Sequence, residues 1–230
     1  MTSFVPLAGL ALVYAFVLRP RMLRWGASDA ELERPFPGAQ IIPGGKRTGT
    51  MATTLDAPPT EVWPWLVQMG LDRGGWYSWD HLDNWGRSST HRIHPEWQHV
   101  AIGDRFTAKP DGSQWWEVVD LDRERFLCLR MSLDLRGHPF DPRGPRPRHS
   151  TDSTWGFLLS GLPGERTRLV VSGYWSLRPE WLQGAASFLL LEPTHWIMQT
   201  RQFANLARRV QRARADRGRT EKLALGPRRR

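Results

Sequence analysis

The 230-residue sequence has little cysteine: its single cysteine, Cys128, excludes a framework of disulfide bonds. Cys128 stands in the apolar run FLCLRM, which favours a buried core thiol over a reactive nucleophile. The body of the chain also lacks net charge. Residues 1–200 hold 21 basic and 21 acidic side chains, whereas residues 201–230 hold 11 basic and 2 acidic ones, so the formal net charge of +9 belongs to the tail.

This distribution argues against a nucleic-acid-binding domain. Such a domain presents a basic face on its folded body together with aromatic side chains, whereas here the aromatic residues and the excess charge are separated along the chain. We therefore do not expect nucleic acid to be a partner. Residues 215–230 are predicted to be a basic, disordered tail, which leaves open a tether that binds anionic lipid or nucleic acid.

The first 18 residues contain no charged side chain, and three arginines follow them in the run RPRMLRW. This pattern predicts a hydrophobic anchor helix over residues 1–25, at the short end of what spans a bilayer. The positive-inside rule then places the body in the cytoplasm. A buried or interfacial amphipathic helix is an alternative, and a signal peptide fits less well because the charges follow the apolar run. Residues 26–47, rich in proline and glycine after a short capped helix, are predicted to be a linker.

The most aromatic stretch, residues 56–85, contains five of the 13 tryptophans. A Thr-rich strand over residues 48–56 is stopped by two prolines, and a helix with apolar residues at helical spacing follows up to Gly70. A second short helix is expected over residues 78–85. So dense an aromatic cluster is either a large core or the wall of an apolar pocket.

Three motifs stand in this part of the chain: DAPPTEVWPWLVQMG, RGGWYSWDHLDN and IHPEWQHVAIGD. Together they resemble a bacterial branch of the START-like superfamily, the SRPBCC or helix-grip proteins, which includes polyketide cyclase and dehydratase-like proteins. The resemblance covers about residues 48–212, and the helix-grip domain is predicted over residues 48–214. It implies an α+β helix-grip fold, in which a curved antiparallel sheet of about six to seven strands wraps around a long C-terminal helix and leaves an apolar cavity.

The rest of the chain agrees with this order of elements. Apolar residues that partly alternate predict strands over residues 104–109, 115–122, 125–133, 153–160 and 167–177. Gly173 within the last strand is expected to mark a bend. Residues 184–191 are interpreted as a separate apolar segment, and Pro193 as the start of the long helix, whose apolar stripe runs from Ile197 to Val210 through Ala204.

Aromatic residues of these elements are the candidates for binding a ligand, together with a histidine on the long helix. They are Trp76, Tyr77, Trp79, Trp97, Trp155, Trp175 and His195. The resemblance also leaves open an acid/base reaction at the cavity, with Asp80, Tyr77 and His195 as catalytic candidates and His81 and Glu96 as further members. Each of these could equally be a structural residue.

His91, His94 and His99 lie close to Glu96 in the sequence and could ligate zinc or iron. The spacing is weak evidence in an expected loop without cysteine, and the resemblance implies no metal, so we predict neither a metal nor another cofactor. The sequence therefore predicts a membrane-anchored helix-grip domain that binds an apolar or amphipathic small molecule, such as a lipid or a polyketide-like compound. The alternatives are a cyclase or dehydratase and a tether through the Arg-rich tail.

Overall fold

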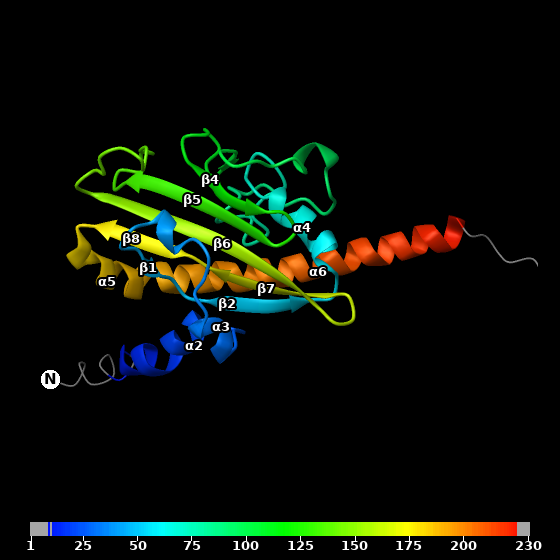
Figure 1. Cartoon of the computed structure of the whole chain (residues 1–230), viewed down its shortest axis with the longest axis horizontal. Helices are drawn as coiled ribbons and strands as arrows, with labels where there is room; N and C mark the ends of the chain where they lie inside the picture. Colours follow the sequence, from blue (N-terminus) through cyan, green and yellow to red (C-terminus); the bar gives the residue numbers. More distant parts are fainter. Residues whose placement is uncertain (1–8, 10, 225–230) are drawn as a thin grey trace, which may run out of the picture.

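The strands of the computed structural model form one antiparallel sheet that curves around a long C-terminal helix (Figure 1). The structure describes residue 9 and residues 11–224, without the side chains of residues 221–224. The predicted α+β fold is confirmed, with eight strands in place of six to seven. The strands are β1 (Lys46–Arg47), β2 (Met51–Leu55), β3 (Arg105–Thr107), β4 (Trp115–Asp122), β5 (Phe126–Asp134), β6 (Ser150–Leu162), β7 (Arg166–Ser172) and β8 (Tyr174–Arg178).

The long strand β6 is the centre of the sheet. On one side it pairs with β5, and beyond β5 follow β4 and β3. On the other side its first part pairs with β8 and its second part with β7, which in turn pair with β1 and β2. Gly173 separates β7 from β8, as predicted for a bend. A Cβ at this position would lie 2.0 Å from the carbonyl oxygen of Thr154, so only glycine allows the two backbones to approach this closely.

The main core lies between the sheet and two helices, α4 (Pro59–Val67) and α6 (Glu192–Ala224). The predicted apolar stripe of α6 is partly wrong, because Ile197 and Ala204 are exposed. Two glutamines are buried instead: the Gln199 amide nitrogen donates to Gln202, and the Gln202 amide nitrogen donates to the carbonyl of Trp76. These hydrogen bonds compensate for the cost of burying the amides, so polar residues occupy core positions.

The helix predicted over residues 78–85 is absent from this segment, which consists of turns. Tyr77 and Trp85, at its two ends, have positive φ angles of 61° and 53°. The side chain of Asn84 accepts a hydrogen bond from the backbone N–H of Trp76 and donates to Asp80. Such bonds from short polar side chains compete with helix formation, and here they determine the conformation.

The N-terminal segment packs on the domain. It contains a π-helical turn η1 (Tyr14–Leu18), α2 (Arg19–Leu23) and α3 (Asp29–Glu33). Trp25 stacks on Phe203 of α6 with 5.9 Å between ring centroids. The expected linker covers the outer face of the sheet, where Phe36 and Ile42 are buried against a second apolar cluster. The 3₁₀ turns η2 (Ala39–Ile41), η3 (Pro95–Trp97) and η4 (Glu180–Leu182) complete the elements, apart from those that precede α6.

The C-terminal helix begins earlier and ends later than the sequence predicts. It runs without interruption through α5 (Gln183–Ala186), the π-helical segment η5 (Ser187–Leu191) and α6, so the start at Pro193 is wrong. The wider π-helical turn accommodates the proline, which has no N–H. Disorder was expected from residue 215, but α6 continues to Ala224; Arg214 and Arg217 form ion pairs with Glu61 of α4. Residues 225–230 lie outside the described part.

The predicted anchor is only partly covered by the structure, since its residues 1–8 and 10 lie outside the described residues. Within the described chain, no helix is both long enough and apolar enough to cross a membrane. The part of the predicted anchor that the structure describes contains η1 and α2, and α2 contacts the C-terminal helix (Figure 1).

Candidate functional site

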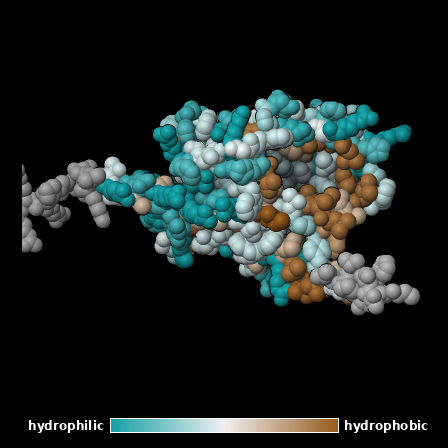
Figure 2. Space-filling view, turned by 180° about the vertical axis from the view of Figure 1, so that it is seen from behind, coloured by the Kyte–Doolittle hydropathy of each residue, from teal (hydrophilic) through white to brown (hydrophobic). Residues whose placement is uncertain are grey.

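The inner face of the sheet, which faces α6, is covered at one end and partly open at the other. On β5, Leu127 and Leu129 are buried, whereas Met131 on the same face is half-buried. On β6, Phe157 is likewise buried, whereas Trp155 on the same face is half-buried. Figure 2, seen from behind the sheet of Figure 1, shows a hollow beside hydrophobic residues on this side. We call the partly open end of this face the inner cleft; the half-buried sheet residues on the inner face at this end are Trp116, Met131, Leu133, Thr151, Ser153 and Trp155.

Four aromatic side chains form one wall of the inner cleft. The ring of Trp155 lies 5.7 Å from that of Trp76, 5.6 Å from that of Trp116 and 4.8 Å from that of Phe157, measured between centroids. The indole nitrogen of Trp155 donates a hydrogen bond of 3.1 Å to Gln199 on α6. This bond orients the Trp155 ring, so the wall presents a fixed apolar surface.

His195 lies one helical turn before Gln199, on the same face of α6. Its Nε2 atom is buried and has no hydrogen-bond partner among the described residues. Desolvation by burial lowers the pKa of His195 to about 4, so the imidazole is neutral at pH 7. A buried polar atom without a partner is costly, and it is satisfied when a bound molecule supplies the missing group.

Two further predicted residues border this region. Trp76 is buried in the wall, and its carbonyl accepts the hydrogen bond from Gln202. Trp175 of β8 is buried opposite Ser153, and its indole nitrogen donates to the Thr151 hydroxyl at 2.6 Å. The structure thus brings Trp76, Trp155, Trp175 and His195 to one end of the inner face. Trp116 belongs to the same group and was missed. It stands two positions before the buried Val118, and this period of two could have placed it on the inner face.

Other predicted ligand-binding residues lie elsewhere. Trp79 is exposed; its ring packs against the Arg201 guanidinium, and its indole nitrogen donates to the Ile197 carbonyl. Trp97 stacks on His94 in a loop, with 4.2 Å between centroids. Tyr77 is fully buried, and burial raises its pKa above the ordinary value.

The predicted acid/base residue Asp80 is held by hydrogen bonds within its loop. Burial raises the pKa of Asp80, but hydrogen bonds from Ser89 and Asn84 outweigh this effect and hold the pKa below its ordinary value. This carboxylate therefore orders a loop, which Arg209 of α6 also binds through the carbonyl of Ser89. Trp79, next to Asp80, donates to the Ile197 carbonyl, so this loop also runs beside the first turns of α6, but no hydrogen bond joins Asp80 to His195 among the described residues.

Asp83 is an ionisable residue that the sequence analysis missed. Neither of its carboxylate oxygens has a hydrogen-bond partner within residues 11–220, and burial raises its pKa to about 6. No local pattern in the sequence indicates this desolvation.

The histidine cluster forms a loop contact. The two ring nitrogens of His94 lie 3.2 Å from Glu96 and 3.0 Å from the Thr90 hydroxyl. His81, His91 and His99 are exposed. In the part of the chain that the structure describes, no three metal-ligating side chains lie close enough to hold an ion.

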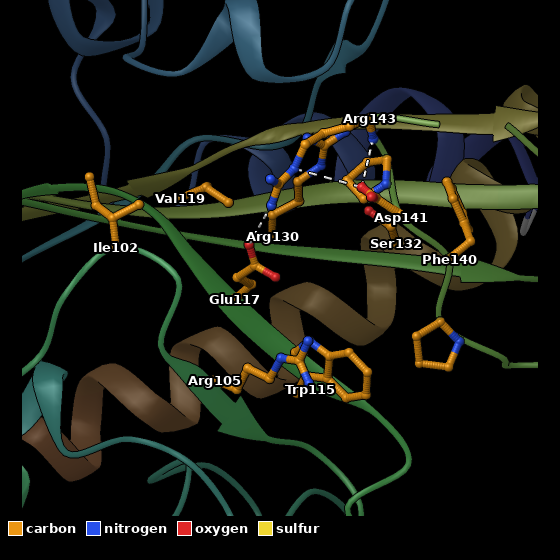
Figure 3. A pocket seen from close by; sticks show the side chains of 12 residues that line it. Ile102, Arg105, Trp115, Glu117, Val119, Arg130, Ser132, Phe140, Asp141 and Arg143 are labelled. Carbon is orange, nitrogen blue, oxygen red and sulfur yellow. Dashed lines mark hydrogen bonds and ion pairs between the residues drawn. The ribbon is translucent and has the colours of Figure 1, made fainter. Parts of the chain in front are cut away.

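A second pocket of about 490 Å³ lies on the outer face of the sheet (Figure 3). It contains none of the predicted site residues, and its lining is mixed in charge. The guanidinium of Arg105 packs 4.0 Å from the Trp115 ring, and Arg130 forms a bidentate pair with the buried Asp152. We call it the outer pocket.

Comparisons with known proteins add little to this geometry. No family model matches the chain, and no curated protein matches it. A solved structure of a Mesorhizobium loti protein is 19% identical, with 71% of this chain and 97% of that chain covered and a TM-score of 0.42. An Arthrobacter aurescens protein is 18% identical, with 72% and 88% covered and a TM-score of 0.43. DynU16, a protein of the dynemicin biosynthetic locus, is 16% identical, with 68% and 46% covered and a TM-score of 0.39. These values assign neither a family nor an activity.

Proposed function

We propose that the protein binds an apolar or amphipathic small molecule, of the lipid or polyketide-like class, in the inner cleft between the sheet and the first turns of α6. The observation that carries this proposal is the buried Nε2 atom of His195, which lacks a partner among the described residues, one helical turn before Gln199, which binds the half-buried Trp155. The START-like, or helix-grip, superfamily is the family that the motifs and the fold favour.

The chemistry of the inner cleft matches such a ligand. Removing about 200 Å² of apolar ligand surface from water supplies about 5 kcal/mol before the costs of association. The neutral imidazole of His195 offers one hydrogen bond, which fixes the orientation of a ligand with a single hydroxyl or carbonyl group. An acid/base enzyme is less well supported, because hydrogen bonds from Asn84 and Ser89 hold the Asp80 carboxylate in its loop and keep its pKa below the ordinary value.

The proposal can be tested by filling the inner cleft. Ser153 of β6 points into it, and Ser153→Trp is expected to weaken binding of a fluorescent fatty acid by about tenfold or more, since the indole occupies the ligand volume. Ser132→Trp is the matched control, because Ser132 lies on the neighbouring strand β5 and lines the outer pocket. Native mass spectrometry of the protein purified in mild detergent should also detect a co-purified apolar compound.

Two outcomes would contradict the proposal. Equal binding by the wild type and the Ser153→Trp variant would remove the inner cleft as the site. A selective loss in the Ser132→Trp variant would instead place the ligand in the outer pocket. Circular dichroism of both variants checks that each one folds.

A further inference from the structure

The start of the C-terminal helix is unusually apolar and exposed. Residues 181–191, with the sequence WLQGAASFLLL, contain no charged side chain. Trp181 is 79% exposed, Leu190 is 68% exposed, and the neighbouring Leu189 is exposed to a similar degree. The described domain therefore leaves the apolar side chains of this segment in contact with solvent, which is typical of an interaction surface.

The N-terminal helix extends this surface. Its large apolar residues from Leu12 to Leu18 are exposed, and Phe16 is 74% exposed. Figure 2 shows hydrophobic residues gathered at one end of the molecule, opposite the end that carries the last turns of α6. We call the exposed apolar residues of these two helices the apolar end surface: Leu12, Val13, Phe16, Val17, Leu18, Trp181, Leu189 and Leu190.

Specific contacts hold the two helices together. Arg19 forms a bidentate ion pair with Glu192, with distances of 2.6 and 2.9 Å, and its guanidinium packs 5.4 Å from the Phe188 ring. The Tyr14 hydroxyl donates a hydrogen bond of 2.6 Å to the Phe188 carbonyl. In a π-helical turn this carbonyl would accept from residue 193, which is a proline without an N–H. The two helices therefore present their apolar side chains as one unit.

We propose that the apolar end surface docks onto a lipid bilayer, with residues 181–191 entering the interfacial layer beside the N-terminal helix. This surface is independent of the inner cleft and does not need a helix that spans the membrane. Three features favour lipid as the occupant. The exposed Arg21 follows the apolar residues of the N-terminal helix, and the exposed Arg178 precedes residues 181–191; both guanidinium groups suit lipid headgroups. Trp181 stands at the edge of the surface. Residues 1–8 and 10, outside the described structure, continue the same uncharged stretch of sequence.

The charges around the surface predict how binding depends on salt. Arg19 and Arg24 are paired with Glu192 and Asp29, and Glu180 follows Arg178 by two positions in the sequence, so little net charge remains. Docking is therefore expected to persist at high salt, because apolar burial supplies the affinity. Binding through the Arg-rich tail would be lost under the same conditions.

The first test is sedimentation of the full chain with vesicles of phosphatidylcholine and phosphatidylserine at high salt. Replacing Trp181, Leu189 and Leu190 with serine is expected to reduce the bound fraction by about tenfold. The control replaces Leu82, Trp85 and Ile102, exposed residues outside this surface, with serine and should bind like the wild type. Equal binding by both triple variants would refute the proposal. So would a wild type that is dimeric without vesicles and becomes monomeric in the first variant, because the surface would then bind a second copy.

A second measurement separates residues 181–191 from the N-terminal helix. The buried Cys128 is poorly accessible to labelling, so an environment-sensitive dye can be attached selectively in the Leu190→Cys variant. We expect its emission to shift to the blue on addition of vesicles and to be quenched by acyl-chain quenchers. The dye on Leu82→Cys should change in neither way. If the protein sediments with vesicles while the dye at position 190 stays unchanged, the N-terminal helix binds alone and the proposal is wrong.

Discussion

Replacing Asp83 with asparagine is expected to reveal a pH-dependent loss of stability that originates at His195. Burial lowers the pKa of His195 from an ordinary 6.5 to about 4 in the folded protein. As the pH falls below 6.5, the unfolded chain binds a proton at this residue and the folded protein does not. The free energy of unfolding therefore decreases, by about 2 kcal/mol between about pH 7 and pH 4.5.

In the wild type Asp83 opposes this effect. Its pKa is raised from 3.8 to about 6 in the folded protein, so the folded state takes up a proton first as the pH falls. This uptake increases the free energy of unfolding over the same pH range. The two buried groups thus compensate for one another, and the wild type should show only a small net change. The substitution Asp83→Asn removes the opposing contribution and leaves that of His195.

Urea unfolding followed by tryptophan fluorescence at the two pH values measures the effect. The Asp83→Asn variant should lose stability on acidification, and the Asp83→Asn/His195→Gln double variant should not. The lower pH of about 4.5 stays above the range in which protonation of Glu31, with a pKa of about 2, and of Asp80, whose pKa is also lowered, would itself reduce the stability. If the single variant is insensitive to pH, or if the double variant loses as much stability, His195 is not desolvated as described.

Two further substitutions test the packing of the sheet. Asp152→Ala leaves the guanidinium groups of Arg130 and Arg146 without their buried carboxylate, and urea unfolding should show a loss of about 3–5 kcal/mol. Glu33→Ala, at an exposed glutamate, is the control, and a comparable loss of stability in this variant would contradict this account. Gly173→Ala places a Cβ against the Thr154 carbonyl and should cost about 2 kcal/mol or more. Gly161→Ala, whose Cβ would meet nothing closer than 3.9 Å, should cost less, and equal midpoints would argue against the close approach at Gly173.

The strands could be predicted from the sequence because their burial follows local alternation. The predicted strand over residues 115–122 has the bounds of β4, and on β5 the core residues Leu127 and Leu129, two positions apart, share one face. Gly173 could be recognised as a bend because few other roles explain a glycine within a strand. The long helix was recognisable as well, but its buried Gln199 and Gln202 were not. Their burial depends on hydrogen-bond partners far away in the sequence.

The errors of the sequence analysis share this physical cause. The helix expected over residues 78–85 is replaced by turns because Asp80 and Asn84 bind Ser89 and Trp76, contacts that no local propensity describes. At the site, Trp155 and His195 could be named because strand and helix periodicity both place them inward. The orientation of the Trp79 side chain, by contrast, is set by an irregular turn, where neither strand nor helix periodicity applies.

The pairing of Arg19 with Glu192 has a consequence for how the chain folds during synthesis. The two residues are 173 positions apart, and Tyr14 likewise finds its acceptor 174 positions later. The N-terminal helix therefore leaves the ribosome long before the segment that holds it is made. Throughout most of translation Tyr14 and Arg19 lack these partners, so nothing from the last helix holds the N-terminal helix, and the nascent chain is exposed to aggregation or to capture by a chaperone or a membrane. Docking of the first helix is thus a late step, coupled to completion of the last one.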